Sequence, residues 1–275
     1  MVTSEELHAI MPGLPAARNA QFLPVLQAAM TEFAIDAAAR AAAFLAQLAH
    51  ESGQFRFMEE IWGPTPAQRR YEPPTTLATQ LGNTEPGDGH RFKGRGPIQI
   101  TGRANYRRFG DLLGIDLIAS PEQAASPDTA FRIAGLFWSK KGLNELADRA
   151  TADAFREITR RINGGFNGLA EREKFYAVAR TVLGVPDALA SRGAAARTAA
   201  PRAPQPRSAE PEFERGYEAI RASVPRRRTR KTAPIKRRTP KPKARPKPRV
   251  KKRTPPRTKK SPPKRSKPKA AKRKR

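Results

Sequence analysis

The last fifty residues limit what this chain can fold into. Between Arg226 and Arg275 there are 27 Lys or Arg, 10 Pro and no Asp or Glu, and the only aliphatic side chains larger than Ala are Ile235 and Val250. Such a segment cannot bury enough apolar surface to offset the conformational entropy lost on ordering. We therefore predict a disordered, Lys/Arg/Pro-rich tail over residues 225–275, with any folded domain upstream of it.

The rest of the chain has a nearly balanced charge. Of the 54 basic residues, 54 − 27 = 27 remain in the first 225 residues against 25 acidic ones, a net charge of +2 out of the total of +29. A chain of this length supports one real hydrophobic core. We predict a single folded domain over residues 1–184. An Ala/Pro/Arg-rich linker over 185–224 follows, with one short helix at 210–222.

Several classes of site and location are disfavoured. No run of twenty apolar residues exists, so we predict no membrane span. The first residues lack a basic region and an apolar core, so we expect synthesis in the cytoplasm without a signal peptide. There is no cysteine, and His8, His50 and His90 lie in unrelated contexts. We therefore predict no metal site. We also predict that the protein needs no cofactor and is a monomer.

Apolar periodicity predicts a mainly α domain. Pro24 suits the first turn of one helix, and Asp36 suits the N-cap of the next. The predicted helices are one that Thr3 or Ser4 caps, 24–33, 37–50, 104–113, 128–141, 152–162 and 169–183. Residues 63–95 are rich in Gly, Pro, Thr and Asn, which predicts a loop with at most a short hairpin. A helical body with a long loop inserted suggests two lobes around a groove.

Two carboxylates suit the hydrolysis of glycosidic bonds, which needs an acid and usually a second carboxylate. Glu51 lies one turn beyond Leu48 at the end of an apolar helix, where burial and the negative helix end would raise its pKa. A stop at Gly53 would let Glu59 or Glu60 approach Glu51. An unbroken helix would hold Glu51 and Glu60 about 13 Å apart. In inverting enzymes the two carboxyl groups are roughly 6.5–9.5 Å apart. The alternative is that all three are solvated surface carboxylates.

An ordered set of motifs resembles glycoside hydrolase family 19, the chitinases and phage-type endolysins. The set consists of His50-Glu51-Ser52-Gly53, Glu59-Glu60, Gly94-Arg95-Gly96-Pro97-Ile98-Gln99-Ile100-Thr101, Asn105-Tyr106 and Asn163-Gly164-Gly165. The resemblance covers about residues 15–183. The absence of cysteine and the compact build are closer to the bacterial and phage branch, which often cuts peptidoglycan rather than chitin.

The resemblance implies a lysozyme-like, two-lobed helical domain with a central groove. It also implies an inverting hydrolase of β-1,4 bonds in N-acetylglucosamine-containing polymers. Glu51 would be the acid and Glu60 the base, with Glu59 as the alternative base. The hydroxyl of Thr101 would hold the attacking water. The alternative is that Thr101 merely caps or begins the helix at Ala104.

The resemblance also implies a set of sugar-binding and supporting residues. It consists of His50, Gln99, Asn105, Tyr106, Asn163 and Arg172. Of these, Arg172 would contact the acid, although its acidic neighbours also suit a surface ion pair. Asn163 equally suits an ordinary helix C-terminus. Trp62, in a loop beside Glu60, is predicted to stack on sugar rings, whereas Trp138 is expected in the core.

The basic tail predicts a second binding function. Dense Lys and Arg bind polyanions by counterion release, with little sequence preference. Residues 239–241 and 261–264 resemble the tails of linker histones. Envelope phosphates and acidic polymers are one partner class, and nucleic acid is the other. We expect action at the cell envelope or outside the cell. The rival interpretation, a nucleic-acid-binding protein with a degenerate hydrolase domain, is disfavoured because the candidate catalytic residues are all present.

Overall fold

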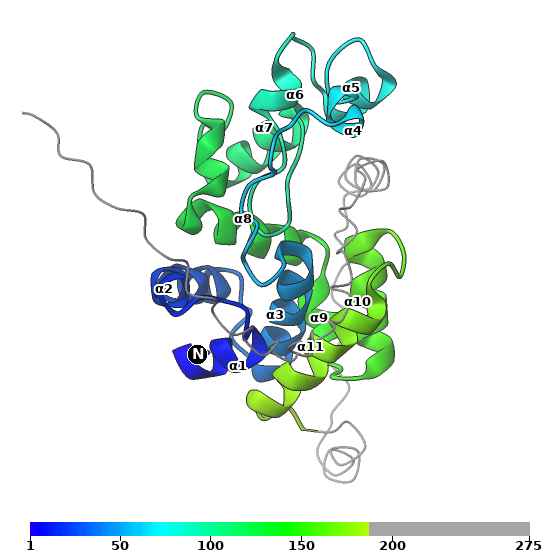
Figure 1. The fold of residues 1–275 in the computed structure, drawn as a ribbon. Coiled ribbons are helices and arrows are strands. Elements are labelled where there is room, and N and C mark those ends of the chain that lie inside the picture. Colours follow the sequence, from blue (N-terminus) through cyan, green and yellow to red (C-terminus); the bar gives the residue numbers. More distant parts are fainter. Residues whose placement is uncertain (187–275) are drawn as a thin grey trace, which may run out of the picture. The chain divides into compact units, whose positions relative to one another are not determined.

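The computed structural model describes residues 1–186, and these residues fold into helices. The predictions for the linker, for the helix at 210–222 and for the basic tail lie outside the described residues. In order, the elements are α1 (Ser4–Ile10), α2 (Ala16–Glu32), α3 (Ala38–Ser52), α4 (Pro66–Arg69), α5 (Thr76–Leu81), α6 (Asp88–Arg91), α7 (Arg103–Leu113), the 3₁₀ helix η1 (Pro121–Ala125), α8 (Pro127–Lys140), α9 (Leu143–Ala147), α10 (Ala152–Asn163) and α11 (Leu169–Val182) (Figure 1). Extended pairing within residues 1–186 is limited to isolated bridges, Glu59 with Arg95 and Arg95 with Ile100.

Two predicted helix starts are wrong. Pro24 lies inside α2, which begins eight residues earlier at Ala16. The buried side chains of Phe22 and Leu26 hold that helix together across the proline, so tertiary packing overrides the local breaker. Asp36 is not the N-cap of α3, because Ala37 occupies that position without any side-chain hydrogen bond.

The predicted loop at residues 63–95 is also wrong, because it contains α4, α5 and α6. Thr65 and Gln68 form a capping box around the start of α4, and Pro66 occupies its first turn. Thr75 caps α5 by accepting a hydrogen bond from the Ala78 N–H. Side-chain caps therefore stabilise helices that are too short for periodicity to reveal.

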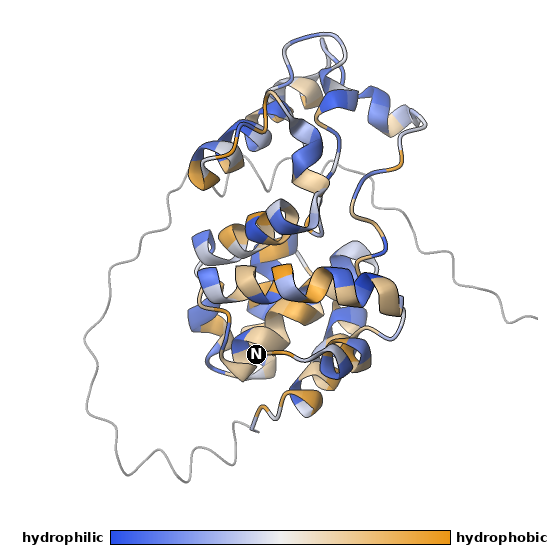
Figure 2. Cartoon of the chain, turned by 90° about the vertical axis from the view of Figure 1, so that its left-hand side faces the viewer, coloured by the Kyte–Doolittle hydropathy of each residue, from blue (hydrophilic) through white to orange (hydrophobic). Residues whose placement is uncertain are grey.

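The main core surrounds α3, whose residues 41–49 are all buried. α11 packs against α3, and α2 packs against α8. Trp138 is 1% exposed and meets Phe44 edge to face at 5.3 Å, so the prediction that it lies in the core is confirmed. Figure 2 shows that most of these helices carry hydrophobic and hydrophilic residues together, as amphipathic helices do.

A second, smaller apolar cluster stabilises the region of α4 to α6. It consists of Tyr71, Leu77 and Leu81, with Trp62 packed against it. These short helices lie together at one end of the described part, and α1, α2 and α11 lie at the other (Figure 1). The predicted two-lobed, mainly α architecture is confirmed. None of the described helices is both long and apolar enough to cross a membrane.

Candidate active site

Glu51 lies at the end of α3, where the chain turns sharply. Gly53 caps the helix in the left-handed conformation, with φ of 59°, so the predicted helix stop is confirmed. Gln54 and Phe55 continue the left-handed turn with φ of 61° and 59°. Such backbone is costly for residues with a Cβ, and it persists only where the surroundings enforce it. Here the hydroxyl of Ser52 accepts a hydrogen bond from the Phe55 N–H at 2.7 Å, while the side chain of Phe55 is fully buried.

Arg172 of α11 holds the Glu51 carboxylate. Its guanidinium is fully buried and donates to Glu51 Oε1 at 2.5 Å, to Gln47 Oε1, and to the Asn167 carbonyl at 3.4 Å. The Glu51 side chain is only 9% exposed. Burial disfavours a charged carboxylate and the guanidinium favours it, so the two opposing effects act on one group. The structure thus places Arg172 against Glu51 rather than in a surface ion pair.

His50 is fixed on the other side of the same helix end. Its Nδ1 lies 2.8 Å from Glu171 Oε2. Burial is the largest cause that lowers the pKa of His50, followed by the positive charge of Arg172, while Glu51 and Glu171 act in the opposite direction. A neutral ring donates from Nδ1, because a carboxylate can only accept. Gly168 is needed beside it, since a Cβ there would lie 2.2 Å from His50 Cε1.

Asn163 is the last residue of α10 and lies at the start of the loop that leads to α11. It is 7% exposed, and neither its amide nitrogen nor its amide oxygen has a hydrogen-bond partner within the described part of the chain. Buried polar groups are nearly always paired, so such an exception asks for an explanation. Both atoms are also shielded from solvent in this conformation.

Glu60 is held by neutral donors. The backbone N–H of Gly94 donates to Glu60 Oε2 at 3.0 Å, and the Gln68 side chain donates to Glu60 Oε1 at 3.0 Å. The Tyr71 hydroxyl also faces this carboxylate. Burial, and then the negative charge of Glu60, raises the pKa of Tyr71.

Glu59 has cationic partners instead. Its Oε1 lies 2.9 Å from Arg95 Nε and 3.4 Å from Lys93 Nζ. Arg95 is 7% exposed, and it also donates to the Tyr106 hydroxyl at 2.9 Å. The two adjacent carboxylates therefore have different environments. Glu60 is surrounded by neutral donors, whereas Glu59 contacts two cations.

The stretch from Gly94 to Thr101 forms a tight turn in front of Glu60. A Cβ at Gly94 would lie 2.8 Å from Gln99 Oε1 and 3.4 Å from Glu60 Cβ, so a larger residue would displace the Gln99 side chain. Gln99 itself has φ of 55°, and its amide donates to the Gly96 carbonyl at 2.8 Å and to the Phe57 carbonyl at 3.3 Å. The Gln99 side chain therefore stabilises the turn, and Gln99 remains a predicted sugar contact.

Thr101 and Asn105 are linked at the start of α7. The buried Thr101 hydroxyl donates to the Gln99 carbonyl at 3.0 Å, which leaves its oxygen able to accept. The Asn105 side chain donates to the Thr101 carbonyl at 2.8 Å. The alternative expectation, that Thr101 caps α7, does not hold, because Gly102 is the N-cap and makes no side-chain hydrogen bond.

The two aromatic candidates lie in different surroundings. Tyr106 is fully buried, and its hydroxyl donates to the Lys93 carbonyl at 2.6 Å. Tyr106 therefore stabilises the start of the turn at residues 94–101 through this hydrogen bond. Trp62 is only partly buried, and its ring centroid lies 5.1 Å from that of His90 and 6.2 Å from that of Tyr71. One side of Trp62 is thus used in packing, and stacking on sugar stays a prediction.

Residue patterns did not reveal every supporting side chain. Gln68 and Tyr71 around Glu60, and Glu171 beside His50, are absent from the predicted site. The Thr65-Pro66-Ala67-Gln68 sequence is a capping-box pattern that could have placed Gln68 at a helix start. No local pattern indicates that its amide also reaches Glu60.

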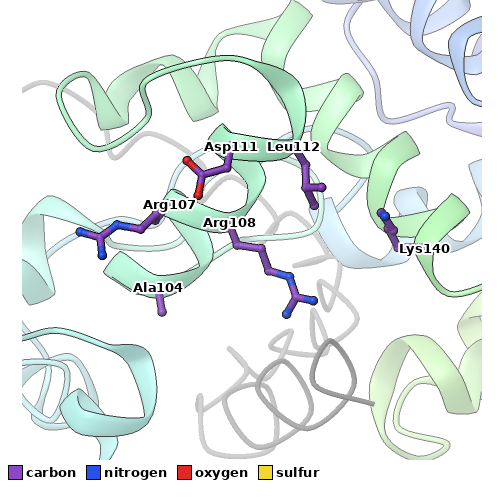
Figure 3. A pocket seen from close by; sticks show the side chains of 6 residues that line it. All are labelled: Ala104, Arg107, Arg108, Asp111, Leu112 and Lys140. Atoms are coloured by element: carbon purple, nitrogen blue, oxygen red, sulfur yellow. The ribbon is translucent and has the colours of Figure 1, made fainter. Parts of the chain in front are cut away.

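A separate pocket of about 430 Å³ lies on α7 and the end of α8 (Figure 3). It is lined by Ala104, Arg107, Arg108, Asp111, Leu112 and Lys140, which include none of the predicted site residues. Within residues 1–186, no group of three His, Asp or Glu side chains is arranged to hold a metal ion.

The helical fold of residues 1–186 belongs to the lysozyme-like class. Chitinase C from Streptomyces griseus has a similar fold, with a TM-score of 0.51 and 24% identity over 68% of this chain and 79% of that one. A bacterial family 19 chitinase gives a TM-score of 0.50 at 23% identity, over 67% of this chain and 96% of that one. At these identities the likeness concerns the fold alone.

Sequence comparison identifies the family. A family model described as chitinase class I matches residues 21–147. A glycosyl hydrolase family 19 domain-containing protein of Haemophilus influenzae is 38% identical over 159 residues, which cover 49% of this chain and 76% of that protein. An endochitinase of Arabidopsis thaliana is 43% identical over 126 residues, covering 45% of this chain but only 39% of the plant protein. The chain belongs to glycoside hydrolase family 19.

Proposed function

We propose that this glycoside hydrolase cleaves β-1,4 bonds of N-acetylglucosamine-containing polymers by a single displacement that inverts the anomeric carbon. The observation that carries the proposal is the pair of differently supported carboxylates: Glu51 is buried beside a guanidinium, and Glu60 is held by neutral donors. Acid and base roles require carboxyl groups whose environments differ.

Glu51 is the proposed general acid. Its side chain is only 9% exposed, so a proton that it takes up for the reaction would be shielded from bulk water. Arg172 fixes the orientation of the carboxyl group through Oε1. Positioning of this kind is as necessary as the proton itself, because the acid must lie within hydrogen-bond reach of the leaving oxygen.

Glu60 is the proposed general base, in preference to Glu59. A base must bind the attacking water, and Glu59 Oε1 is already in contact with the two cations Arg95 and Lys93. The three neutral donors around Glu60, which include the Tyr71 hydroxyl, leave the carboxylate room for one further hydrogen bond. Thr101 would hold the attacking water through its hydroxyl oxygen, while Asn105 fixes the backbone at Thr101.

The sugar subsites would be formed by Asn163, Gln99 and Trp62. The unpaired amide of Asn163 matches an acetamido group, which offers one acceptor and one donor. Gln99 and Trp62 extend the contacts on the Glu60 side.

The polymer is either chitin or peptidoglycan. Plant relatives named endochitinases favour chitin. The pocket on α7 and α8, with Arg107, Arg108 and Lys140, favours a polymer that carries carboxylates or phosphates, as bacterial cell walls do. We propose action at the cell envelope or outside the cell, where either polymer occurs.

The tail would bind polyanions in addition. Its 27 basic residues without one acidic residue favour non-specific, salt-sensitive binding. Deletion of residues 225–275 is expected to leave cleavage of a soluble oligosaccharide unchanged, and to weaken co-sedimentation with bacterial sacculi and gel shifts with random-sequence DNA. If only DNA binding fell, the envelope role would be wrong, and a linker-histone-like role would replace it.

The experiment that tests the proposed chemistry uses Glu51→Gln. The amide keeps the shape but supplies no proton, so turnover of chitin oligosaccharides and sacculi should fall by roughly 10²–10⁴-fold. Proton NMR of the first turnovers of the parent protein should show α-anomeric product. Activity above a tenth of the parent value would exclude Glu51 as the acid, and initial β product would exclude inversion.

A further inference from the structure

The pocket on α7 and α8 has no part in the proposed chemistry, although its charges are grouped on one helix face. The residues that line it from α7 are three or four positions apart, which places them on the same face: Ala104, Arg107, Arg108, Asp111 and Leu112. Lys140, the last residue of α8, completes the pocket (Figure 3). Its volume of about 430 Å³ lies within the roughly 300–1,000 Å³ of ligand-binding pockets, so it holds more than a single phosphate or carboxylate group.

The pocket contains cations that other parts of the domain do not neutralise. Arg103, one turn earlier on α7, forms an ion pair with Asp88. By contrast, neither Arg107 nor Lys140 forms an ion pair within residues 1–186. Three basic side chains and one acidic side chain line the pocket, which gives it a net charge of +2. A pocket of this charge attracts a ligand with an excess of negative groups.

The other lining groups disfavour a simple anion. Asp111 lies four residues from Arg107 on the same face of α7, so a phosphate in the pocket would also face a negative charge. Leu112 is 45% exposed, so the pocket offers an apolar surface as well. A ligand with several carboxylates, one ammonium group and methyl groups matches all of these features. A short acidic peptide that carries an amine has this chemistry.

The pocket and the candidate active site share one short helix. Ala104 directly precedes Asn105, and Arg108 lies three residues beyond it, on a neighbouring face of α7. Because α7 has 11 residues, it is only about 16 Å long. An extended peptide of five residues spans roughly the same distance. A peptide branch on a polymer bound beside Asn105 is therefore long enough to enter the pocket.

We propose that the pocket on α7 and α8 is a second binding site for a short acidic peptide that carries an amine and is attached to the polymer being cleaved. The carboxylates of the peptide pair with Arg107 and Lys140, and its ammonium group pairs with Asp111. The inference rests on the proposed function and deepens it, because peptide branches of this chemistry occur on bacterial wall polymers and not on chitin. The pocket thus selects peptide-bearing strands over bare ones.

The test measures hydrolysis by the full-length chain of two soluble substrates that differ only in the peptide. One is uncross-linked peptidoglycan strands, and the other is the same strands after an amidase has removed their peptides. Arg107→Gln combined with Lys140→Gln should raise KM for the peptide-bearing strands about tenfold at unchanged kcat, because two partly exposed ion pairs are lost. KM for the peptide-free strands should stay within about 1.5-fold.

Two further variants make the test specific. Asp111→Asn should raise KM for the peptide-bearing strands about threefold, because it removes the partner of the ammonium group. Arg149→Gln combined with Lys174→Gln is the matched control. Both residues are exposed, neither forms an ion pair within residues 1–186, and the change in net charge is the same. The control should leave both KM values unchanged, which separates the pocket from the general attraction of a basic chain for an acidic polymer.

The outcomes separate the pocket from the proposed function. If the parent cleaves both kinds of strand and the Arg107/Lys140 variant keeps its KM, or the control raises KM equally, the pocket proposal is wrong and the proposed function stands. A lower KM with Asp111→Asn would indicate a simple anion such as phosphate and would also overturn the peptide site. Cleavage of N-acetylglucosamine oligosaccharides but of neither kind of strand would mean that the polymer is chitin, and the pocket proposal would again be wrong. If the parent cleaves none of these substrates, the proposed function fails and the pocket proposal fails with it.

Discussion

Replacing Arg172 by Met should destabilise the domain strongly, because the change strands buried polar groups. Met keeps most of the volume of the side chain but removes the guanidinium that faces Glu51 and Gln47. Breaking a buried ion pair by removing one partner costs about 3–5 kcal/mol. For a domain of this size the corresponding fall in Tm is about 6–20 °C.

Urea unfolding of the full-length chain measures the effect, with the fluorescence of the buried Trp138 as the reporter. The exposed ion pair of Arg132 with Glu32 provides the control, and Arg132→Met should cost at most about 1 kcal/mol.

A double-mutant cycle tests the reasoning itself. If the cost of Arg172→Met comes from a charged Glu51 left facing no guanidinium, then adding Glu51→Gln should recover part of the lost stability. The coupling between the two substitutions should therefore reach about 2 kcal/mol or more. Costs that add within about 0.5 kcal/mol would show that the two groups are energetically independent, and the argument from the buried pair would be refuted.

Two further predictions concern neighbouring groups. Glu60→Ala should lose at least tenfold more activity than Glu59→Ala in oligosaccharide hydrolysis, and the reverse order would exchange their roles. Because the pKa of His50 is lowered in the folded chain, the unfolded chain binds its proton first as the pH falls below about 6.5. The wild type should therefore lose stability relative to His50→Gln below that pH, by at most about 1.4 kcal/mol per pH unit, and urea titrations showing a constant difference would contradict this.

Periodicity predicted α10 and α11 closely because their apolar positions repeat regularly. The apolar positions of α10 and α11 follow the helical repeat, and their predicted bounds differ from the observed ones by a single residue. The predictions failed where one contact decides the structure. Pro24 is tolerated inside α2 because of what Phe22 and Leu26 bury, and such tertiary contacts leave no local mark in the sequence.

The motif order predicted which residues belong to the candidate site, which stays a prediction, but it did not predict the partners of these residues. The motif order placed Glu51, Glu60 and Arg172 in one family pattern. Whether a carboxylate faces a cation or a neutral amide depends on segments far apart in the chain, such as α3 and α11, which are 121 residues apart at the Glu51–Arg172 contact. Gln68 contacts Glu60 from α4, a helix that is too short for periodicity to detect.

The strained turn after α3 lets Glu51 and Glu60 have different hydrogen-bond partners. A straight continuation of α3 would carry Glu59 and Glu60 away from Glu51, whereas three successive left-handed residues at Gly53, Gln54 and Phe55 reverse the chain directly after the helix. The energetic cost of that turn is offset by the burial of Phe55 against Phe22 and Phe131, with ring centroids 6.1 and 5.0 Å away. The main core around α3 therefore stabilises the backbone turn that precedes Glu60 and its hydrogen-bond donors. A smaller side chain at residue 55 would act on the site through this turn, without touching either carboxylate.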